Sequence, residues 1–155
     1  MNPDTNYWLM KSEGDCYPIS QLQEDKTTPW SGVRNFQARN YMKEMKVGDM
    51  VLFYHSSTKP IGVYGLARVT KEAHPDQTAF DKRDEHYDDR STPEKPIWEC
   101  VDVAYVSTFK EPITMDEMKR HRELSAMKLF QKGSRLSVIP VSDKEYEFIV
   151  SLGKV

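Results

Sequence analysis

Five segments of the chain carry apolar residues in a pattern that favours β-strands. They are residues 7–11, 50–54, 61–69, 97–106 and 135–141. Residues 50–54 are apolar throughout, so we expect this strand at the centre of a sheet. Pro140 interrupts the last segment and cannot donate a backbone hydrogen bond to a neighbour, which predicts an edge strand.

One amphipathic helix is predicted in the first third of the chain. The apolar positions that follow the i, i+3, i+4, i+7 spacing of a helix are Ala38, Tyr41, Met42 and Met45. We expect these four side chains to face a core, with Asn35 as the N-cap residue. Arg39 and Lys43 fall away from this stripe and should lie on the outer side of the helix.

Three further helix starts are indicated by capping-box patterns, in which Ser or Thr precedes Gln or Glu by three residues. The pairs are Ser20 with Gln23, Thr114 with Glu117, and Ser142 with Glu145. Residues 72–95 show neither pattern, because they are polar, densely charged and interrupted by prolines. We expect a long surface excursion there, which composition alone would allow to be a mobile loop.

Length and composition limit the class of the protein. A chain of 155 residues suits one domain, residues 1–155. No apolar run approaches the roughly 20 residues that cross a membrane. Cys16 and Cys100 are the only cysteines and show no metal-ligand spacing. We therefore expect a reducing compartment, cytoplasmic or else cytosolic and nuclear, and no bound metal or cofactor.

The formal net charge of −2 conceals an uneven distribution. Residues 34–71 carry seven Lys and Arg against two Asp and Glu, a net of +5, whereas residues 72–117 carry five against thirteen, a net of −8. Residues 118–155 carry eight against four, a net of +4. Such alternation can place a basic face opposite an acidic one, although ordinary solvated surface charge is the alternative. For a nucleic-acid ligand we expect modest, salt-sensitive binding focused on one pocket.

The most informative chemistry lies in residues 30–40, Trp-Ser-Gly-Val-Arg-Asn-Phe-Gln-Ala-Arg-Asn. The indole of Trp30 offers a flat face for stacking, the amide of Asn35 can donate and accept in one plane, and the guanidinium of Arg34 can hold a phosphate. This mixture predicts a nucleobase with its phosphate as the ligand. The structural alternatives are that Trp30 anchors the core and that Arg34 binds carbonyls or carboxylates internally.

Three other motifs accompany this segment in the order expected of a known family. They are Tyr-Trp-Leu-Met-Lys-Ser-Glu at 7–13, Phe-Tyr-His-Ser at 53–56 and Arg-Leu-Ser-Val at 135–138. The chain resembles the EVE domain family over about residues 7–152. The resemblance implies a PUA-like α+β fold, an open mixed β-barrel with surrounding helices. It also implies non-catalytic binding of DNA or RNA that carries a modified base, such as a modified cytosine or adenine.

The positions that match these motifs are candidate ligand-binding residues. They are Lys11, Ser12, Trp30, Arg34, Asn35, Tyr54, His55, Ser56, Arg135 and Ser137. The candidates for phosphate binding are Arg34, Arg39 and Lys43. In this hypothesis one base is flipped out of its stack into the barrel mouth, Trp30 packs against its face, and the polar residues read its edge.

Three positions depart from the family pattern. Gly14 stands where proline is common, Ser31 where an acidic residue often follows the tryptophan, and Ile139 where glutamine is usual. If that glutamine reads the ligand in relatives, Ile139 changes the ligand preference. If the position only packs, nothing follows.

Two other classes of function stay open. One is a small-molecule or protein-interaction module built on the same barrel. The other is a nucleic-acid-processing enzyme, with His55 as general base and Cys16 or Ser56 as nucleophile. The sequence contains no nucleophile motif, no evident third orienting residue and no glycine-rich phosphate loop, which disfavours the enzyme.

Overall fold

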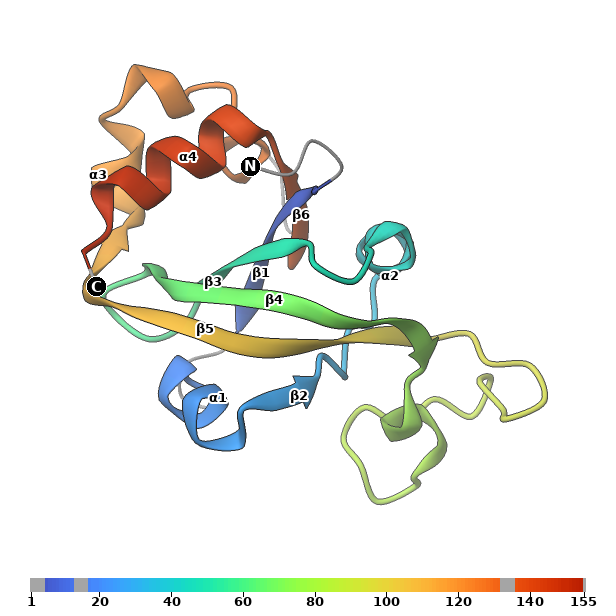
Figure 1. Ribbon diagram of the computed structural model, residues 1–155. Coiled ribbons are helices and arrows are strands. Elements are labelled where there is room, and N and C mark those ends of the chain that lie inside the picture. Colours follow the sequence, from blue (N-terminus) through green and yellow to red (C-terminus); the bar gives the residue numbers. More distant parts are fainter. Residues whose placement is uncertain (1–4, 13–16, 132–135, 155) are drawn as a thin grey trace.

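The computed structural model describes residues 5–12, 17–131 and 136–154. Within these ranges a mixed β-sheet is covered by helices (Figure 1). The strands are β1 (Tyr7–Ser12), β2 (Thr27–Pro29), β3 (Met50–His55), β4 (Gly62–Pro75), β5 (Glu99–Thr114) and β6 (Val138–Val141). The α-helices are α1 (Ile19–Asp25), α2 (Phe36–Glu44), α3 (Met115–Lys119) and α4 (Asp143–Leu152). Three short 3-10 helices are η1 (Gln77–Phe80), η2 (Arg122–Leu124) and η3 (Lys128–Phe130).

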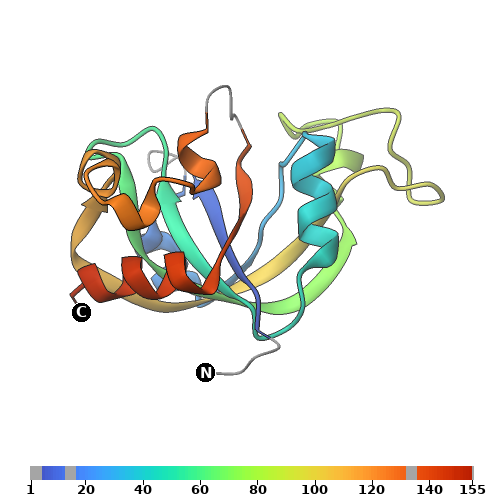
Figure 2. The ribbon, with the colours of Figure 1, turned by 90° about the horizontal axis from the view of Figure 1, so that it is seen from above.

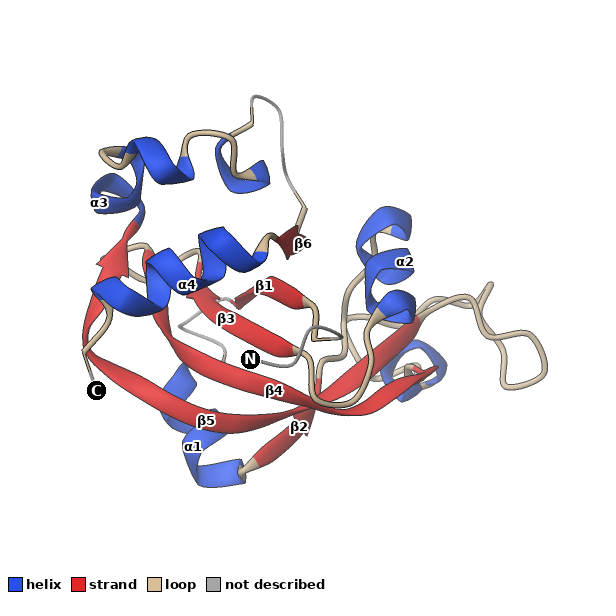
Figure 3. Ribbon diagram, turned by 45° about the horizontal axis from the view of Figure 1, so that its top comes forward, coloured by secondary structure: helices blue, strands red, loops and turns tan. Residues whose placement is uncertain are grey.

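The six strands lie in the order β2-β5-β4-β3-β1-β6. β1 pairs with β3 in parallel, and the other neighbours are antiparallel. The long strands β4 and β5 curve around the molecule, and their register shifts at several points (Figure 3). No pairing between the edge strands β2 and β6 is present in the described ranges. The sheet is therefore curved but open, which confirms the predicted α+β fold with an open mixed barrel.

Two hydrophobic cores lie on opposite faces of the sheet, because side chains alternate sides along each strand. Leu9, Leu52 and Tyr54 face one core, which α3 and α4 cover with Met118 and Ile149. Met10, Val51 and Phe53 face the other core, together with Ile19 of α1 and Met42 of α2. Figure 2 shows α4 and α2 at opposite ends of the molecule.

The predicted helix caps are confirmed at three positions. The side chain of Asn35 accepts a hydrogen bond from the backbone N–H of Ala38, and Ser142 forms a complete capping box with Glu145. Thr114 also caps α3, by accepting from the N–H of Glu117.

The predicted capping box at Ser20 is wrong. Ser20 lies inside α1, and the N-cap position belongs to Pro18, which makes no side-chain cap bond. The first N–H of this helix, that of Ile19, instead donates to Nε2 of His55 at 3.2 Å. A residue distant in sequence thus satisfies a group that a local cap would otherwise satisfy.

The segment between β4 and β5 is an excursion that its own side chains hold in place; we call residues 76–98 the excursion. Trp98 donates from Nε1 to the carboxylate of Asp88 at 2.8 Å, and the N–H of Ile97 donates to the hydroxyl of Ser91 at 2.9 Å. β4 begins one residue later than predicted and continues to Pro75, while β5 continues to Thr114, so the excursion leaves from the ends of two unusually long strands.

In the described ranges no helix is long and apolar enough to span a membrane.

Candidate functional site

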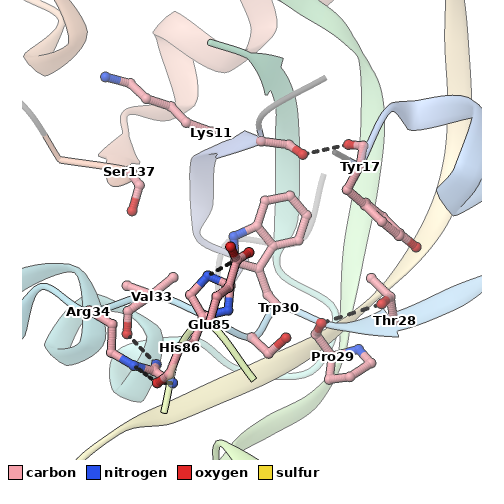
Figure 4. A pocket seen from close by; sticks show the side chains of 13 residues that line it. Lys11, Tyr17, Thr28, Pro29, Trp30, Val33, Arg34, Glu85, His86 and Ser137 are labelled. Carbon is pink, nitrogen blue, oxygen red and sulfur yellow. Dashed lines mark hydrogen bonds and ion pairs between the residues drawn. The ribbon is translucent and has the colours of Figure 1, made fainter. Parts of the chain in front are cut away.

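A cavity of about 770 Å³ opens where the ends of β1 and β2 meet the loop before α2 and the excursion (Figure 4). Its volume falls in the range typical of ligand-binding clefts, roughly 300–1,000 Å³. The lining residues are Lys11, Ser12, Tyr17, Thr28, Pro29, Trp30, Ser31, Gly32, Val33, Arg34, Glu85, His86 and Ser137. Five of the predicted site residues, Lys11, Ser12, Trp30, Arg34 and Ser137, are therefore brought together here.

Trp30 is fixed on its inner side and adjoins the cavity. Its backbone N–H donates to the carbonyl of Val101 at 2.7 Å, and its ring meets the Phe53 ring edge-on, with centroids 5.4 Å apart at 83°. The residue is 8% exposed, so it is both a core anchor and part of the cavity wall.

The indole N–H of Trp30 differs from those of the other two tryptophans. Trp8 donates its Nε1–H to Asp49 at 3.0 Å, and Trp98 donates to Asp88 at 2.8 Å. Among the described residues no acceptor within hydrogen-bond distance engages Nε1 of Trp30. The tryptophan at the cavity thus retains a donor that a ligand can use.

Arg34 is held by internal acceptors, which was the structural alternative for this residue. Nε and Nη2 donate to the carbonyl of His86 at 2.9 and 2.8 Å, Nη1 donates to the carbonyl of Val33 and to Asp76, and Nη2 also donates to the Thr78 hydroxyl. These five bonds use all five N–H groups of the guanidinium. Arg34 therefore joins the loop before α2, residues 30–35, to the excursion; we call this loop the cavity loop. In this conformation Arg34 has no donor left for a phosphate.

Asp76 is the partner that anchors this loop, and it is fully buried. It accepts hydrogen bonds from the N–H of Gly32 at 2.8 Å, from Arg34 at 3.0 Å and from both the hydroxyl and the N–H of Thr78. Burial by itself raises the pKa of Asp76, but the hydrogen bonds from Thr78, Gly32 and Arg34 outweigh it and hold the pKa below its usual value. The carboxylate is therefore kept ionised.

Gly32 lets the loop pass against the excursion. Its φ of +89° lies in the left-handed region that glycine adopts without strain. A Cβ at this position would lie 2.9 Å from the imidazole of His86. That imidazole is placed in turn by Asp84, whose carboxylate lies 3.1 Å from Nδ1. The loop and the excursion fit together here with no room for a side chain.

The end of β1 contributes Lys11 and Ser12. The buried hydroxyl of Ser12 donates to the carbonyl of Tyr17 at 2.5 Å, and its oxygen can still accept a hydrogen bond. Lys11 is partly buried, burial lowers its pKa, and its ammonium points away from the indole in Figure 4. Its backbone N–H donates to the carbonyl of Ser137 at 2.8 Å, which brings the start of β6 to the cavity.

Four predicted site residues lie outside this lining. Asn35 serves as the cap of α2. Tyr54 points to the opposite core, where its hydroxyl donates to the Met115 sulfur at 3.4 Å and burial raises its pKa to about 12. His55 is buried against Tyr64, with ring centroids 3.6 Å apart, and Ser56 donates to the backbone carbonyl of Ser12 at 3.3 Å.

His55 is not arranged as a general base for Ser56. Its Nε2 accepts from the Ile19 N–H, its Nδ1 is buried without a partner in the described part of the chain, and burial lowers its pKa. Arg135, Gly14 and Cys16 lie outside the described residues.

The two other predicted phosphate ligands project from α2 and not into the cavity. Arg39 donates from Nη1 to the carbonyl of Ile97 at 2.8 Å, and the ammonium of Lys43 lies 3.5 Å from the carboxylate of Glu99. Ile139 is fully buried in the core that α4 covers, and it does not line the cavity. At this position the departure from the family pattern therefore concerns packing.

Several lining residues were not predicted. Ser31, Gly32 and Val33 lay within the segment that the sequence had singled out, and their position between Trp30 and Arg34 was the available signal. Glu85 and His86 come from the excursion, some fifty residues later in the chain. No spacing in the sequence links them to Trp30, because a tertiary contact brings them there.

Comparison with known proteins agrees with this fold. The EVE domain model matches residues 6–152. Thymocyte nuclear protein 1 of Rattus norvegicus is 42% identical, with 96% of this chain and 74% of that protein aligned. The structure of a hypothetical protein from Leishmania major is 50% identical, with a TM-score of 0.93 and 96% and 94% of the two chains covered. The structure of the human THYN1 protein in complex with 5-methylcytosine-containing DNA is 38% identical, with a TM-score of 0.90 and 96% and 97% covered. The chain therefore belongs to the EVE domain family.

Proposed function

We propose that this protein is a non-catalytic DNA-binding module that accepts one modified base, flipped out of its stack, in the cavity beside Trp30. The observation that carries the proposal is an open cavity of about 770 Å³ walled by an indole whose N–H has no acceptor among the described residues. The complex of human THYN1 with 5-methylcytosine-containing DNA supports the choice of DNA and of a modified cytosine.

Five of the lining residues have distinct roles in this proposal. Trp30 stacks against the base, while its N–H and the hydroxyls of Ser12 and Ser137 read the polar edge. Lys11, at the rim, attracts the phosphate. Arg34 positions the loop through Asp76 and does not touch the phosphate.

The magnitudes require polar contacts in addition to stacking. Stacking on an aromatic side chain contributes about 1–3 kcal/mol per base, which is comparable with the few kcal/mol that unstacking costs. Recognition of one added methyl group contributes roughly 1–3 kcal/mol, a preference of about 10- to 200-fold. A modified base is therefore bound selectively only when its edge and its phosphate are engaged together.

The test is a titration of labelled oligonucleotides that differ at one central position, monitored by fluorescence anisotropy. The central base is cytosine, methylcytosine, hydroxymethylcytosine or methyladenine. We expect one modified base to bind most tightly and this preference to fall in Trp30→Phe and to disappear in Trp30→Ala. Equal affinity for all four oligonucleotides, unchanged by Trp30→Ala, contradicts the proposal.

Trp8→Phe is the matched control for Trp30→Phe. It makes the same substitution at a buried tryptophan that donates to Asp49 and does not line the cavity. We expect it to lower stability and to leave the preference among the four bases unchanged.

A further inference from the structure

A second group of flat side chains lies next to the cavity loop, with Phe36 exposed and Trp98 buried beneath it; we call Phe36, Trp98 and Arg39 the platform. The rings of Phe36 and Trp98 are stacked, with centroids 4.8 Å apart and planes at 24°. The guanidinium carbon of Arg39 lies 4.9 Å from the Phe36 centroid and 6.0 Å from that of Trp98. None of the three lines the cavity.

Phe36 is largely exposed. The residue is 53% exposed, because it begins α2 outside the buried stripe that contains Ala38 and Met42. The Arg39 guanidinium lies over both rings, and more than half of Phe36 still faces the surroundings. An exposed aromatic ring of this kind is one on which a base can stack.

The inner part of the platform is held firmly. Trp98 is 3% exposed, donates to Asp88 at 2.8 Å, and has the Arg34 guanidinium 5.5 Å from its ring. Arg34 belongs to the cavity wall, so the platform and the cavity share one support. Phe36 thus rests on a ring that does not need to be ordered when a ligand arrives.

Arg39 supplies charge that is not neutralised by a neighbour. Its guanidinium donates to the carbonyl of Ile97 and twice to the amide oxygen of Asn40, and none of the described carboxylates pairs with it. Of its five N–H groups, two remain without an acceptor in the described ranges. A phosphate oxygen would satisfy them.

The platform is close enough to the cavity to meet the same DNA strand. Phe36 is six positions after Trp30, a stretch of chain that spans at most about 20 Å. Flipping a base removes the stacking partner of its neighbour, and an aromatic side chain can replace that partner.

We propose that the platform binds the nucleotide next to the flipped base: Phe36 stacks on the neighbouring base and Arg39 holds the phosphate. This inference rests on the proposed function and names a second contact for the same ligand. The affinity then depends also on the nucleotide beside the modified base, because a base must be present there to stack on Phe36.

The test compares three oligonucleotides with a central methylcytosine. One has normal nucleotides on both sides, one has an abasic residue on the 5′ side, and one has an abasic residue on the 3′ side. For the unsubstituted protein we expect roughly fivefold weaker binding or more when the correct flank is abasic. In Phe36→Ala that penalty should disappear, and Arg39→Gln should weaken all three oligonucleotides alike. Val47→Ala is the matched control, since Val47 is 60% exposed and lies beyond the end of α2.

The outcomes separate this inference from the proposed function. If neither abasic flank weakens binding, or if Phe36→Ala keeps the full penalty, the platform does not bind the neighbouring base. The preference for methylcytosine over cytosine, measured with intact flanks, reports on the cavity alone, and Phe36→Ala should retain it. If the unsubstituted protein binds methylcytosine and cytosine equally well, the proposed function is contradicted, but the flank measurement remains valid.

Discussion

The guanidinium of Arg34 lies 3.0 Å from the buried carboxylate of Asp76, and this pair ties the cavity loop to the end of β4. Because Asp76 also accepts from the N–H of Gly32, one side chain fixes two points of the loop that follows Trp30. The indole is consequently presented by a loop anchored to the sheet, which reduces the ordering that a ligand must impose.

Removal of the charge of Asp76 should destabilise the protein. In Asp76→Asn, Arg34 keeps its charge without a carboxylate partner, and one acceptor oxygen becomes a donor that faces other donors. Breaking a buried pair costs about 3 kcal/mol or more in the free energy of unfolding. Urea denaturation at pH 7 measures the loss, and Asp81→Asn, at a half-exposed carboxylate, is the control.

The effect of Asp76 should also depend on pH. Its folded-state pKa is depressed below the unfolded value of about 3.9, so its contribution is complete above that value and is lost as the pH falls through the folded-state pKa. The difference in unfolding free energy between the unsubstituted protein and Asp76→Asn should therefore be constant from pH 7 to about 5 and shrink below 4. A difference that stays constant down to pH 2 would show that the charge of Asp76 does not matter.

Gly32→Ala should destabilise the protein more than Gly48→Ala. Both glycines have a left-handed φ, +89° and +97°, but a Cβ meets the His86 ring only at Gly32 and nothing within 4 Å at Gly48. Gly48→Ala measures the backbone strain, about 1–2 kcal/mol. The excess at Gly32 measures the collision with His86 and should be relieved in Gly32→Ala/His86→Ala. Equal losses at both sites in denaturation experiments would mean that the imidazole moves aside freely.

His55 should make the protein less stable in mild acid. Burial lowers its folded-state pKa, so the folded protein resists a proton that the unfolded chain accepts below about 6.5. Stability is then lost as the pH falls from 6.5 toward the folded-state pKa, and protonation of Nε2 would oppose the bond from Ile19. Histidine NMR resonances followed through pH titration should place His55 below 6.5. A value above 6.5 would reverse the predicted slope.

The salt dependence of DNA binding should separate Lys11 from Arg34. Lys11→Gln should lower the slope of log affinity against log salt by about one unit, as loss of one phosphate contact does. Arg34→Ala should leave that slope unchanged and lower stability, because its donors all serve internal acceptors. Lys110→Gln, at an exposed lysine of β5 outside the cavity, is the control.

Local features of the sequence were predicted well. The cap at Asn35 and the capping box at Ser142 depend on residues within one helical turn, and the edge position of β6 follows from Pro140 alone. The failed cap at Ser20 shows the limit of this approach, since a distant histidine satisfies that helix start instead.

The site was predictable in part. Trp30 and the end of β1 do line the cavity, as the motifs implied. Tyr54 was a candidate because it belongs to the Phe-Tyr-His-Ser motif, but alternation along β3 points it to the opposite core. Asp76, Glu85 and His86 could not be found from spacing, since they reach the loop through contacts between segments distant in sequence.

The cavity has two kinds of wall, and this division affects how the family can diversify. One wall is formed by β1, β2 and the cavity loop, which belong to the sheet and its cores. The other wall is formed by Glu85 and His86 of the excursion, which extends from the ends of β4 and β5. Loops of this kind tolerate replacement and changes of length better than strands do. A new ligand preference can therefore arise by exchanging the excursion while the barrel and Trp30 are inherited intact.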